Sequence, residues 1–264
     1  MALADEDTVE ALSTGDLDGT GVEPVVEIED EPEDSDPEEQ QQDRNRRRKR
    51  AVARPLHRRW PGAVVPYAIL SNFTRRQLEP IAAAVQELEA KTCVRFVDVG
   101  TFEKETGKAA ARFLEFRRIA NETKKCYARD APQHYVALNE AQCFAKGVLL
   151  HELLHALGFF HEHSRSDRDA FVRVNLDNVI KNDQKQFAKQ SNRSSDNQET
   201  KYDYGSIMHY GRHAASIDKV SETLVPLQDG VEIGQLDGLS ASDVHEVNMA
   251  YNCIGGKHQG PRAD

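Results

Sequence analysis

The sequence predicts an α+β fold, because several short candidate strands precede the main candidate helices instead of alternating with them. β-branched and apolar residues gather in brief runs between residues 64 and 138, whereas helical apolar spacing marks two later segments. No internal repeat is apparent, and 264 residues suffice for one large domain or two small ones.

The first candidate strand is residues 64–69, a β-branched run that follows the turn-forming pair Pro61-Gly62. A helix is expected from residue 75 onwards, with Thr74 as its N-cap. Its apolar residues recur every three or four positions and so share one face: Leu78, Ile81, Val85 and Leu88.

Three further strands are expected at residues 94–99, 113–119 and 134–138. We expect residues 134–138 to form the edge of the sheet, because their flank is polar and a helix follows soon after. That helix, residues 147–157, is largely apolar.

Residues 164–203 are polar and carry few periodic signals. A last helix is expected over residues 239–251, where Ser240 and Asp243 stand in capping-box register. Val244, Val247 and Tyr251 share one of its faces.

The charge is divided unevenly along the chain. Residues 1–50 hold 17 acidic and 6 basic side chains, whereas residues 51–264 hold 27 acidic and 28 basic ones. The acidic segment is expected to be largely disordered. The body is near neutral and has no apolar run long enough to span a bilayer, so neither nucleic acid nor a membrane is expected as a partner.

Six of the seven residues 44–50 are basic, and this block ends the acidic segment. It could be a nuclear-localisation or nucleic-acid patch, a solvated charge run, or a site where a basic-residue-specific protease cuts after Arg50. The chain has four cysteines, an even number, and three glycosylation sequons, which begin at Asn72, Asn121 and Asn192. These are features of secreted proteins, and they favour the interpretation as a cleavage site. The first ten residues lack the pattern of a signal peptide, so we expect that segment to be absent from this sequence.

The helix at residues 147–157 carries His151, Glu152 and His155. Residues four apart lie on one helical face, so the two imidazoles can converge on one point. Gly158 can adopt a positive φ, end the helix and let His161 approach the same point.

Three neutral imidazoles hold zinc with one position open to water, which is the arrangement of a catalytic site. Zinc lowers the pKa of that water to roughly 7, and Glu152 is suited to act as the general base. A His-Glu pair on a helix is often only a surface feature. Polar side chains in an apolar helix, however, are costly to bury without partners.

The run HELLHALGFFHE fits the metzincin signature HExxHxxGxxH, and SIMHY follows about fifty residues later. Glu162, directly after the third histidine, makes the chain similar to the astacins. The similarity also includes WPG, VPY, FHEHSR, DRD and PLQ and covers most of residues 51–253. It implies a two-lobed domain: a mixed twisted sheet and the active-site helix, then a mostly irregular lobe ending in a helix.

The resemblance further implies that Met208 forms an apolar floor beneath the metal. Tyr210 would ligate zinc at rest and then hydrogen-bond the developing oxyanion. Extended peptide would pair with the edge strand near residues 134–138. The implied activity is that of a zinc-dependent metalloendopeptidase, with one zinc ion per chain and protein or peptide substrates.

Residues alone allow three cysteine pairings. The family implies Cys93–Cys253 and Cys126–Cys143, and the longer loop should contribute on the order of 4–5 kcal/mol. Residues 1–50 would be a propeptide, residues 51–253 the peptidase domain and residues 254–264 a short tail. Leu236 stands where several relatives carry arginine, so acidic specificity is not expected there.

Cleavage after Arg50 by an activating protease would free the ammonium group of Ala51 to meet Glu162. Asp16 is the candidate for blocking zinc in the zymogen. A catalytically inactive module on the same fold and a nuclear regulatory protein are the alternatives. The sequence favours a secreted, extracellular, monomeric protease.

Overall fold

A computed structural model describes residues 52–53, 59–119, 126–129, 134–191, 195–196 and 200–253. The acidic segment, the basic block and the tail after residue 253 lie outside these ranges. So do Asp16, Ala51, Asn121 and Asn192.

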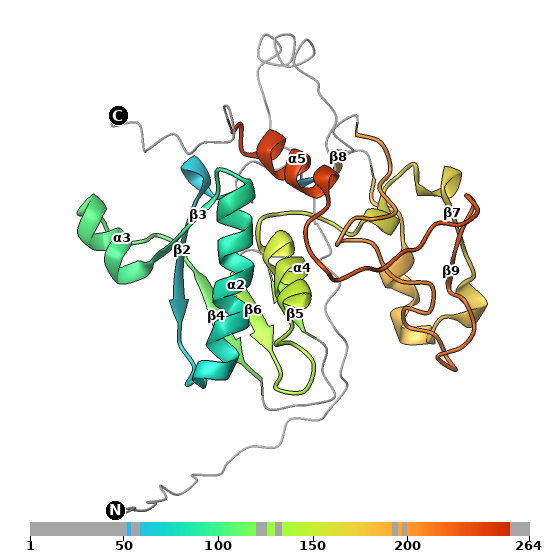
Figure 1. The fold of residues 1–264 in the computed structure, drawn as a ribbon, viewed down its shortest axis with the longest axis horizontal. Coiled ribbons are helices and arrows are strands. Elements are labelled where there is room, and N and C mark those ends of the chain that lie inside the picture. The colour runs from blue at the N-terminus through green and yellow to red at the C-terminus, as the bar shows by residue number, and fades with distance from the viewer. Residues whose placement is uncertain are drawn as a thin grey trace, which may run out of the picture. The chain divides into compact units, whose positions relative to one another are not determined.

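The N-terminal lobe is built on a five-stranded mixed sheet (Figure 1). Its order is β3–β2–β4–β6–β5; the first four strands are parallel and β5 is antiparallel to β6. The strands are β2 (Val64–Ile69), β3 (Arg95–Asp98), β4 (Leu114–Arg118), β5 (Tyr127–Arg129) and β6 (Tyr135–Leu138). The sequence-based segments for β2, β3, β4 and β6 are therefore correct to within two residues at each end.

The expectation that residues 134–138 form the sheet edge is wrong. β6 is paired on both sides, with β4 and with β5, and all four of its residues are buried. β5 is the edge strand instead. Its three residues are too few to show a period, so no pattern in the sequence marks it as a strand.

Helices α2 (Arg75–Lys91) and α4 (Lys146–Ala156) contact each other and cover one face of this sheet (Figure 1). Thr74 precedes α2 as expected, and its main-chain N–H donates to Gln77 Oε1 at 2.9 Å. The buried apolar side chains of both helices belong to the main core, which includes Ile81, Leu88, Leu150 and Leu154.

A short helix, α3 (Val99–Thr106), follows β3 directly and was not anticipated. The carboxylate of Asp98 accepts hydrogen bonds from the main-chain N–H groups of Gly100 and Thr101, so it caps the helix. Gly107 ends it in the left-handed conformation, with φ 68°. The alternation of residues 94–99 concealed this cap, because Asp98 also fits an exposed strand position.

The C-terminal lobe has little regular structure, as expected, and its own small core. It contains the antiparallel pair β7 (Val172–Val174) and β9 (Leu224–Pro226). Short 3₁₀ turns come before β7, η3 (Glu162–Ser164) and η4 (Arg168–Ala170), and after it, η5 (Leu176–Asn178) and η6 (Lys181–Phe187). Phe187, Tyr202 and Leu224 are buried there, separately from the first core. A further pair joins β1 (Val52–Ala53) to β8 (Ser195–Asp196).

The chain then returns to the first lobe through α5 (Ala241–Ala250). Ser240 Oγ accepts from the N–H of Asp243 at 2.9 Å, and the Asp243 carboxylate accepts from the N–H of Ser240, which confirms the expected capping box. Val247 and Ala250 pack into the main core. The α+β class and the two-lobed arrangement are thus both confirmed.

Both disulfides that the family resemblance implied are present, Cys93–Cys253 and Cys126–Cys143. The first ties the end of α2 to the end of α5. The second ties the edge strand β5 to the segment just before α4.

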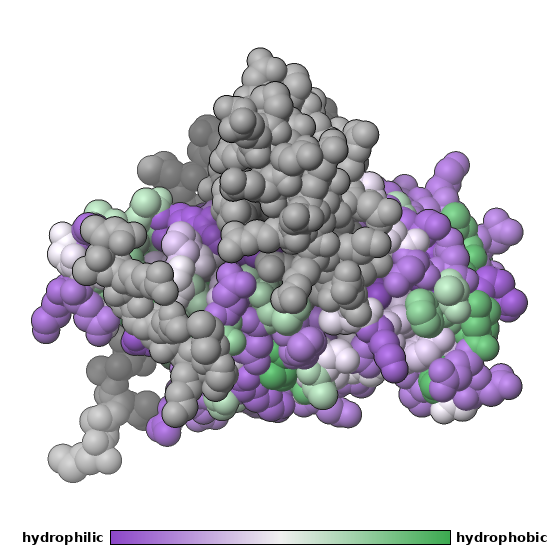
Figure 2. All heavy atoms as spheres, turned by 90° about the horizontal axis from the view of Figure 1, so that it is seen from above, coloured by the Kyte–Doolittle hydropathy of each residue, from purple (hydrophilic) through white to green (hydrophobic). Residues whose placement is uncertain are grey.

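The face of the molecule in Figure 2 is mainly hydrophilic where its residues are coloured, and hydrophobic side chains form small separate groups on it. None of the helices in the described ranges combines the length and the hydropathy needed to cross a membrane.

The two disulfides close loops of very different length, so their removal should destabilise the domain unequally. In the chain-entropy model, a separation of 160 residues corresponds to about 5 kcal/mol and one of 17 residues to about 3 kcal/mol. We expect replacement of Cys93 and Cys253 by serine to lower the free energy of unfolding by about 2 kcal/mol more than replacement of Cys126 and Cys143. Guanidinium denaturation measures both, and equal losses would contradict the expectation.

Candidate metal centre

Three histidines from two adjoining segments meet at the end of α4. His151 and His155 lie one turn apart on this helix, whose leucines at 149, 150, 153 and 154 are all buried. Leu157 follows the helix as its C-cap, and Gly158 then takes φ 93°, a conformation that favours glycine. The chain turns there, as expected, and His161 faces the same point.

The three Nε2 atoms point at one another. Nε2 of His161 lies 3.1 Å from that of His151 and 3.0 Å from that of His155. Within the described ranges, these three side chains form the one cluster of at least three potential ligands that could hold a metal ion.

A hydrogen bond at Nδ1 fixes the tautomer of each of the two histidines on α4. Nδ1 of His151 donates to the carbonyl oxygen of Ile207, and Nδ1 of His155 donates to that of Phe159, both at 2.8 Å. A carbonyl can only accept, so each proton sits on Nδ1 and each Nε2 presents its lone pair to the centre. Lone pairs facing each other at this distance fit a shared cation, which makes the donor set suitable for zinc.

Burial keeps these imidazoles in the neutral form that a metal needs. It lowers the pKa of His151 and the pKa of His161, and with the neighbouring His151 it lowers the pKa of His155 to about 3. Glu152, next to the first histidine on α4, is only 6% exposed.

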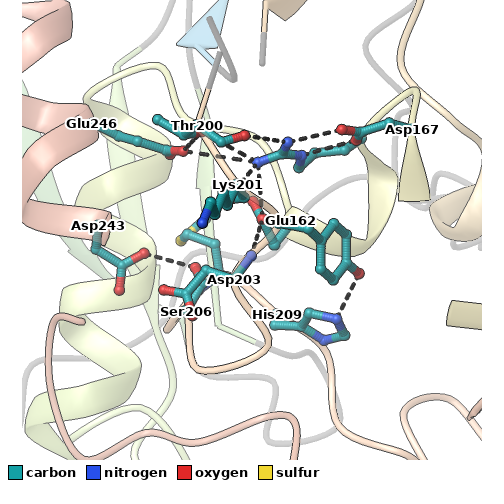
Figure 3. Close-up of polar contacts among 12 residues, drawn as sticks. Glu162, Asp167, Thr200, Lys201, Asp203, Ser206, His209, Asp243 and Glu246 are labelled. Atoms are coloured by element: carbon teal, nitrogen blue, oxygen red, sulfur yellow. Dashed lines mark hydrogen bonds and ion pairs between the residues drawn. The ribbon is translucent and has the colours of Figure 1, made fainter. Parts of the chain in front are cut away.

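The turn around Met208 supports the centre from the other side. Ser206 Oγ donates to Asp243 Oδ1 at 2.6 Å (Figure 3). The N–H of Ile207 donates to Asp243 Oδ2 at 3.0 Å. The carbonyl of Ile207 in turn accepts from His151, so the capping residue of α5 holds the turn that orients a histidine. Met208 itself is 3% exposed within the main core. The sequence indicated Asp243 only as a helix cap.

Tyr210 lies beside the third histidine. The centre of its ring is 4.4 Å from that of His161 and 4.1 Å from that of His163, on which it stacks. Its hydroxyl donates to Gln186 Oε1 at 3.0 Å. Gln186 lies in the polar stretch without periodic signals, so the sequence did not single it out.

Comparison with known proteins decides the family. The model of the Astacin peptidase family matches residues 52–252. Zinc metalloproteinase nas-13 of Caenorhabditis elegans is 38% identical over 204 residues, which make up 77% of this chain and 43% of that protein. High choriolytic enzyme 1 of Oryzias latipes is 37% identical over 197 residues, 72% of this chain and 66% of that protein.

The chain belongs to the astacin family. The solved structure of High choriolytic enzyme 1, described as a hatching enzyme zinc-protease from medaka fish, superposes with a TM-score of 0.65 at 34% identity, over 74% of this chain and 94% of that one. Myroilysin shares the fold, with a TM-score of 0.52 at 19% identity. The family makes a single catalytic zinc ion the cofactor of this astacin domain. The chain spans 43% of nas-13 and 32% of nas-15, both larger proteins.

The glutamate that places the chain among the astacins is buried with a cation. Glu162 is 4% exposed and accepts from Arg165 Nη1 at 3.1 Å and from the N–H of Asp203 at 2.8 Å (Figure 3). Arg165 also pairs with Asp167 and lies 4.0 Å from Glu246. Burial raises the pKa of Glu162 to about 8, against the opposing charge of Arg165.

Arg165 therefore provides a compensating charge for Glu162 that the sequence did not reveal. Glu162 and Glu246 share this one guanidinium, and burial raises the pKa of Glu162 to about 8 and that of Glu246 to about 7, so a further cation beside them would favour their ionised forms.

The turn at Gly158 positions His161, so a change at Gly158 should affect metal binding. We expect Gly158→Ala to reduce zinc affinity, because an L-residue at φ 93° is strained and relief of that strain moves His161. Gly230, with φ 73° and open space around its Cβ position, is the matched control. Both variants should lose on the order of 1–2 kcal/mol of stability, but competition with a zinc chelator should detect weaker binding only for Gly158→Ala. Equal zinc affinity in the two variants would contradict the role of this turn.

Proposed function

We propose that the chain is a zinc-dependent metalloendopeptidase that hydrolyses internal peptide bonds. His151, His155 and His161 would hold the metal, Glu152 would be the general base and Tyr210 would donate to the oxyanion. The observation that carries this proposal is the convergence of three Nε2 atoms, with main-chain carbonyls setting the tautomers of His151 and His155.

Zinc, when bound, supplies the Lewis acidity that activates water near neutral pH and polarises the scissile carbonyl. Glu152 follows the first ligand on α4 and is buried beside it, where a carboxylate can take a proton from water and deliver it to the leaving amine. Its low exposure supports this role, because a carboxyl group shielded from bulk water does not lose its proton to the solvent before the proton reaches the leaving amine.

The phenol of Tyr210 is suited to stabilise the negative charge that develops on the carbonyl oxygen. Its ring contacts His161, so the hydroxyl can act close to the proposed ligands. Met208, buried in the core, would form the apolar floor that the family resemblance implies.

Substrate would bind in an extended conformation along β5 rather than β6, since β5 is the strand at this end of the sheet. β5 contacts α4, and the disulfide Cys126–Cys143 fixes it near the start of that helix. Main-chain pairing there would bring a peptide alongside the histidines of α4.

We further propose a secreted zymogen, processed by a basic-residue-specific protease after Arg50 and kept latent by residues 1–50, with Asp16 as the candidate blocking ligand. Both disulfides are formed, which suits an oxidising compartment and disfavours a nuclear protein. Asn72, the sequon in the described ranges, is exposed in the loop before α2 and can accept a glycan. The raised pKa values of Glu162 and Glu246 suit the ammonium group of Ala51, because a cation beside these carboxyls would favour their ionised forms.

The role of Glu152 predicts a variant that binds zinc but does not cleave. Glu152→Gln keeps the shape of the side chain and removes the base, so kcat should fall by at least about a hundredfold at unchanged zinc stoichiometry. The matched control is Glu140→Gln, at an exposed residue that pairs with Arg118. Hydrolysis of a quenched fluorescent peptide, together with metal analysis, measures both. Near-normal turnover by Glu152→Gln would refute its role, and so would activity of wild type that survives complete zinc removal.

If the chain is processed after Arg50, activity should depend on cleavage of the peptide bond between Arg50 and Ala51. Replacing residues 47–50 with alanine should leave an uncut, inactive protein, because the ammonium group of Ala51 never forms. Mass spectrometry of the secreted material gives the N-terminus, and the same peptide assay gives the activity. An active enzyme that still carries residues 1–50 would contradict the zymogen proposal.

A further inference from the structure

We propose that Gln186 is a positioning residue for Tyr210: it accepts the phenol O–H in the resting enzyme, which leaves a lone pair of the phenol oxygen for the metal, and it loses this hydrogen bond when the oxyanion forms. The inference rests on the proposed function, because it concerns the resting partner of the group assigned to the oxyanion.

The main chain at Gln186 is fixed by the same histidine on which Tyr210 stacks. The carbonyl oxygen of Gln186 accepts from Nε2 of His163 at 3.2 Å. The next residue, Phe187, is 2% exposed in the core of the C-terminal lobe, and its carbonyl accepts from Arg168 Nη1 at 2.9 Å. The side chain of Gln186 therefore starts from a backbone that is held at two consecutive residues.

The ring of Tyr210 is fixed by the same segment. It stacks on His163 with ring centres 4.1 Å apart and meets Phe187 edge-on at 5.9 Å. Its hydroxyl donates to Gln186 Oε1 at 3.0 Å, and the amide of Gln186 is held in turn, because its Nε2 donates to Asp183 Oδ1 at 3.2 Å.

A phenol has a single O–H to donate. The hydrogen bond to Gln186 and a hydrogen bond to the oxyanion are therefore mutually exclusive, and the first must break before the second forms. Loss of the competing acceptor should favour oxyanion binding by about two- to tenfold, the ratio that corresponds to the net strength of one neutral hydrogen bond.

The test uses the zinc-loaded enzyme and a phosphinic peptide, whose tetrahedral anion mimics the oxyanion. Gln186→Met keeps the length of the side chain without the carbonyl, so we expect it to bind this inhibitor about two- to tenfold more tightly by calorimetry. Gln186→Glu keeps an acceptor and should not bind it more tightly than wild type. Gln184→Met is the matched control, because Gln184 lies in the same turn but donates to the carbonyl of Leu176.

Because Gln186 is proposed to act through the phenol of Tyr210, Gln186→Met should leave the affinity for the phosphinic peptide unchanged in a Tyr210→Phe background. Unchanged or weaker binding by Gln186→Met, or tighter binding that persists without the phenol, overturns the proposal. Gln186→Asn, whose shorter amide cannot reach, is expected to behave as Gln186→Met does and replaces it if that variant does not fold. Tyr210→Phe alone tests the oxyanion role of Tyr210 separately from the positioning role of Gln186. Weaker inhibitor binding by Tyr210→Phe supports the oxyanion role, and the comparison of Gln186→Met with and without the phenol then decides the role of Gln186. Unchanged binding refutes both.

Discussion

The structure depends on bringing three neutral imidazoles together inside a hydrophobic core, with their ligand nitrogens all within 4.8 Å of one another. Such an arrangement is unfavourable unless each ring is oriented and a cation occupies the centre. Orientation comes from two main-chain carbonyls, those of Ile207 and Phe159, which accept the Nδ1 protons of His151 and His155. Each carbonyl belongs to a segment outside α4, so the metal centre is a property of the folded domain and not of the helix alone.

Residues of both lobes contribute to this centre. From the C-terminal side, α5 fixes the turn at Ile207 through Asp243, and Cys93–Cys253 ties the same helix to the first lobe. The N–H of Glu162 donates to the carbonyl of Met208, which joins the segment of the third histidine to that turn. The side chain of the same Glu162 forms the buried ion pair with Arg165. The segment of the third histidine and this ion pair are thus connected through Glu162.

Much of this could be predicted from local pattern. The helical spacing of His151 and His155, the glycine needed at a positive φ and the capping box at Ser240 each follow from a few residues, and each is confirmed. The misassigned sheet edge has another origin, since β5 is three residues long and is defined by its pairing with β6. Arg165 and Gln186 were missed as partners of Glu162 and Tyr210 because their contacts form only when the irregular lobe has folded. The functional roles of the site residues rest on the family resemblance as well as on this geometry.

X-ray absorption at the zinc edge on the purified protein shows whether three histidines of this chain bind one zinc ion. We expect one zinc per chain, with nitrogen and oxygen neighbours at about 2.0–2.1 Å and the multiple-scattering pattern of three imidazoles. The pattern should fall to two imidazoles in His161→Ala. A sulfur shell at about 2.3 Å, or a spectrum that the loss of His161 leaves unchanged, would contradict this expectation.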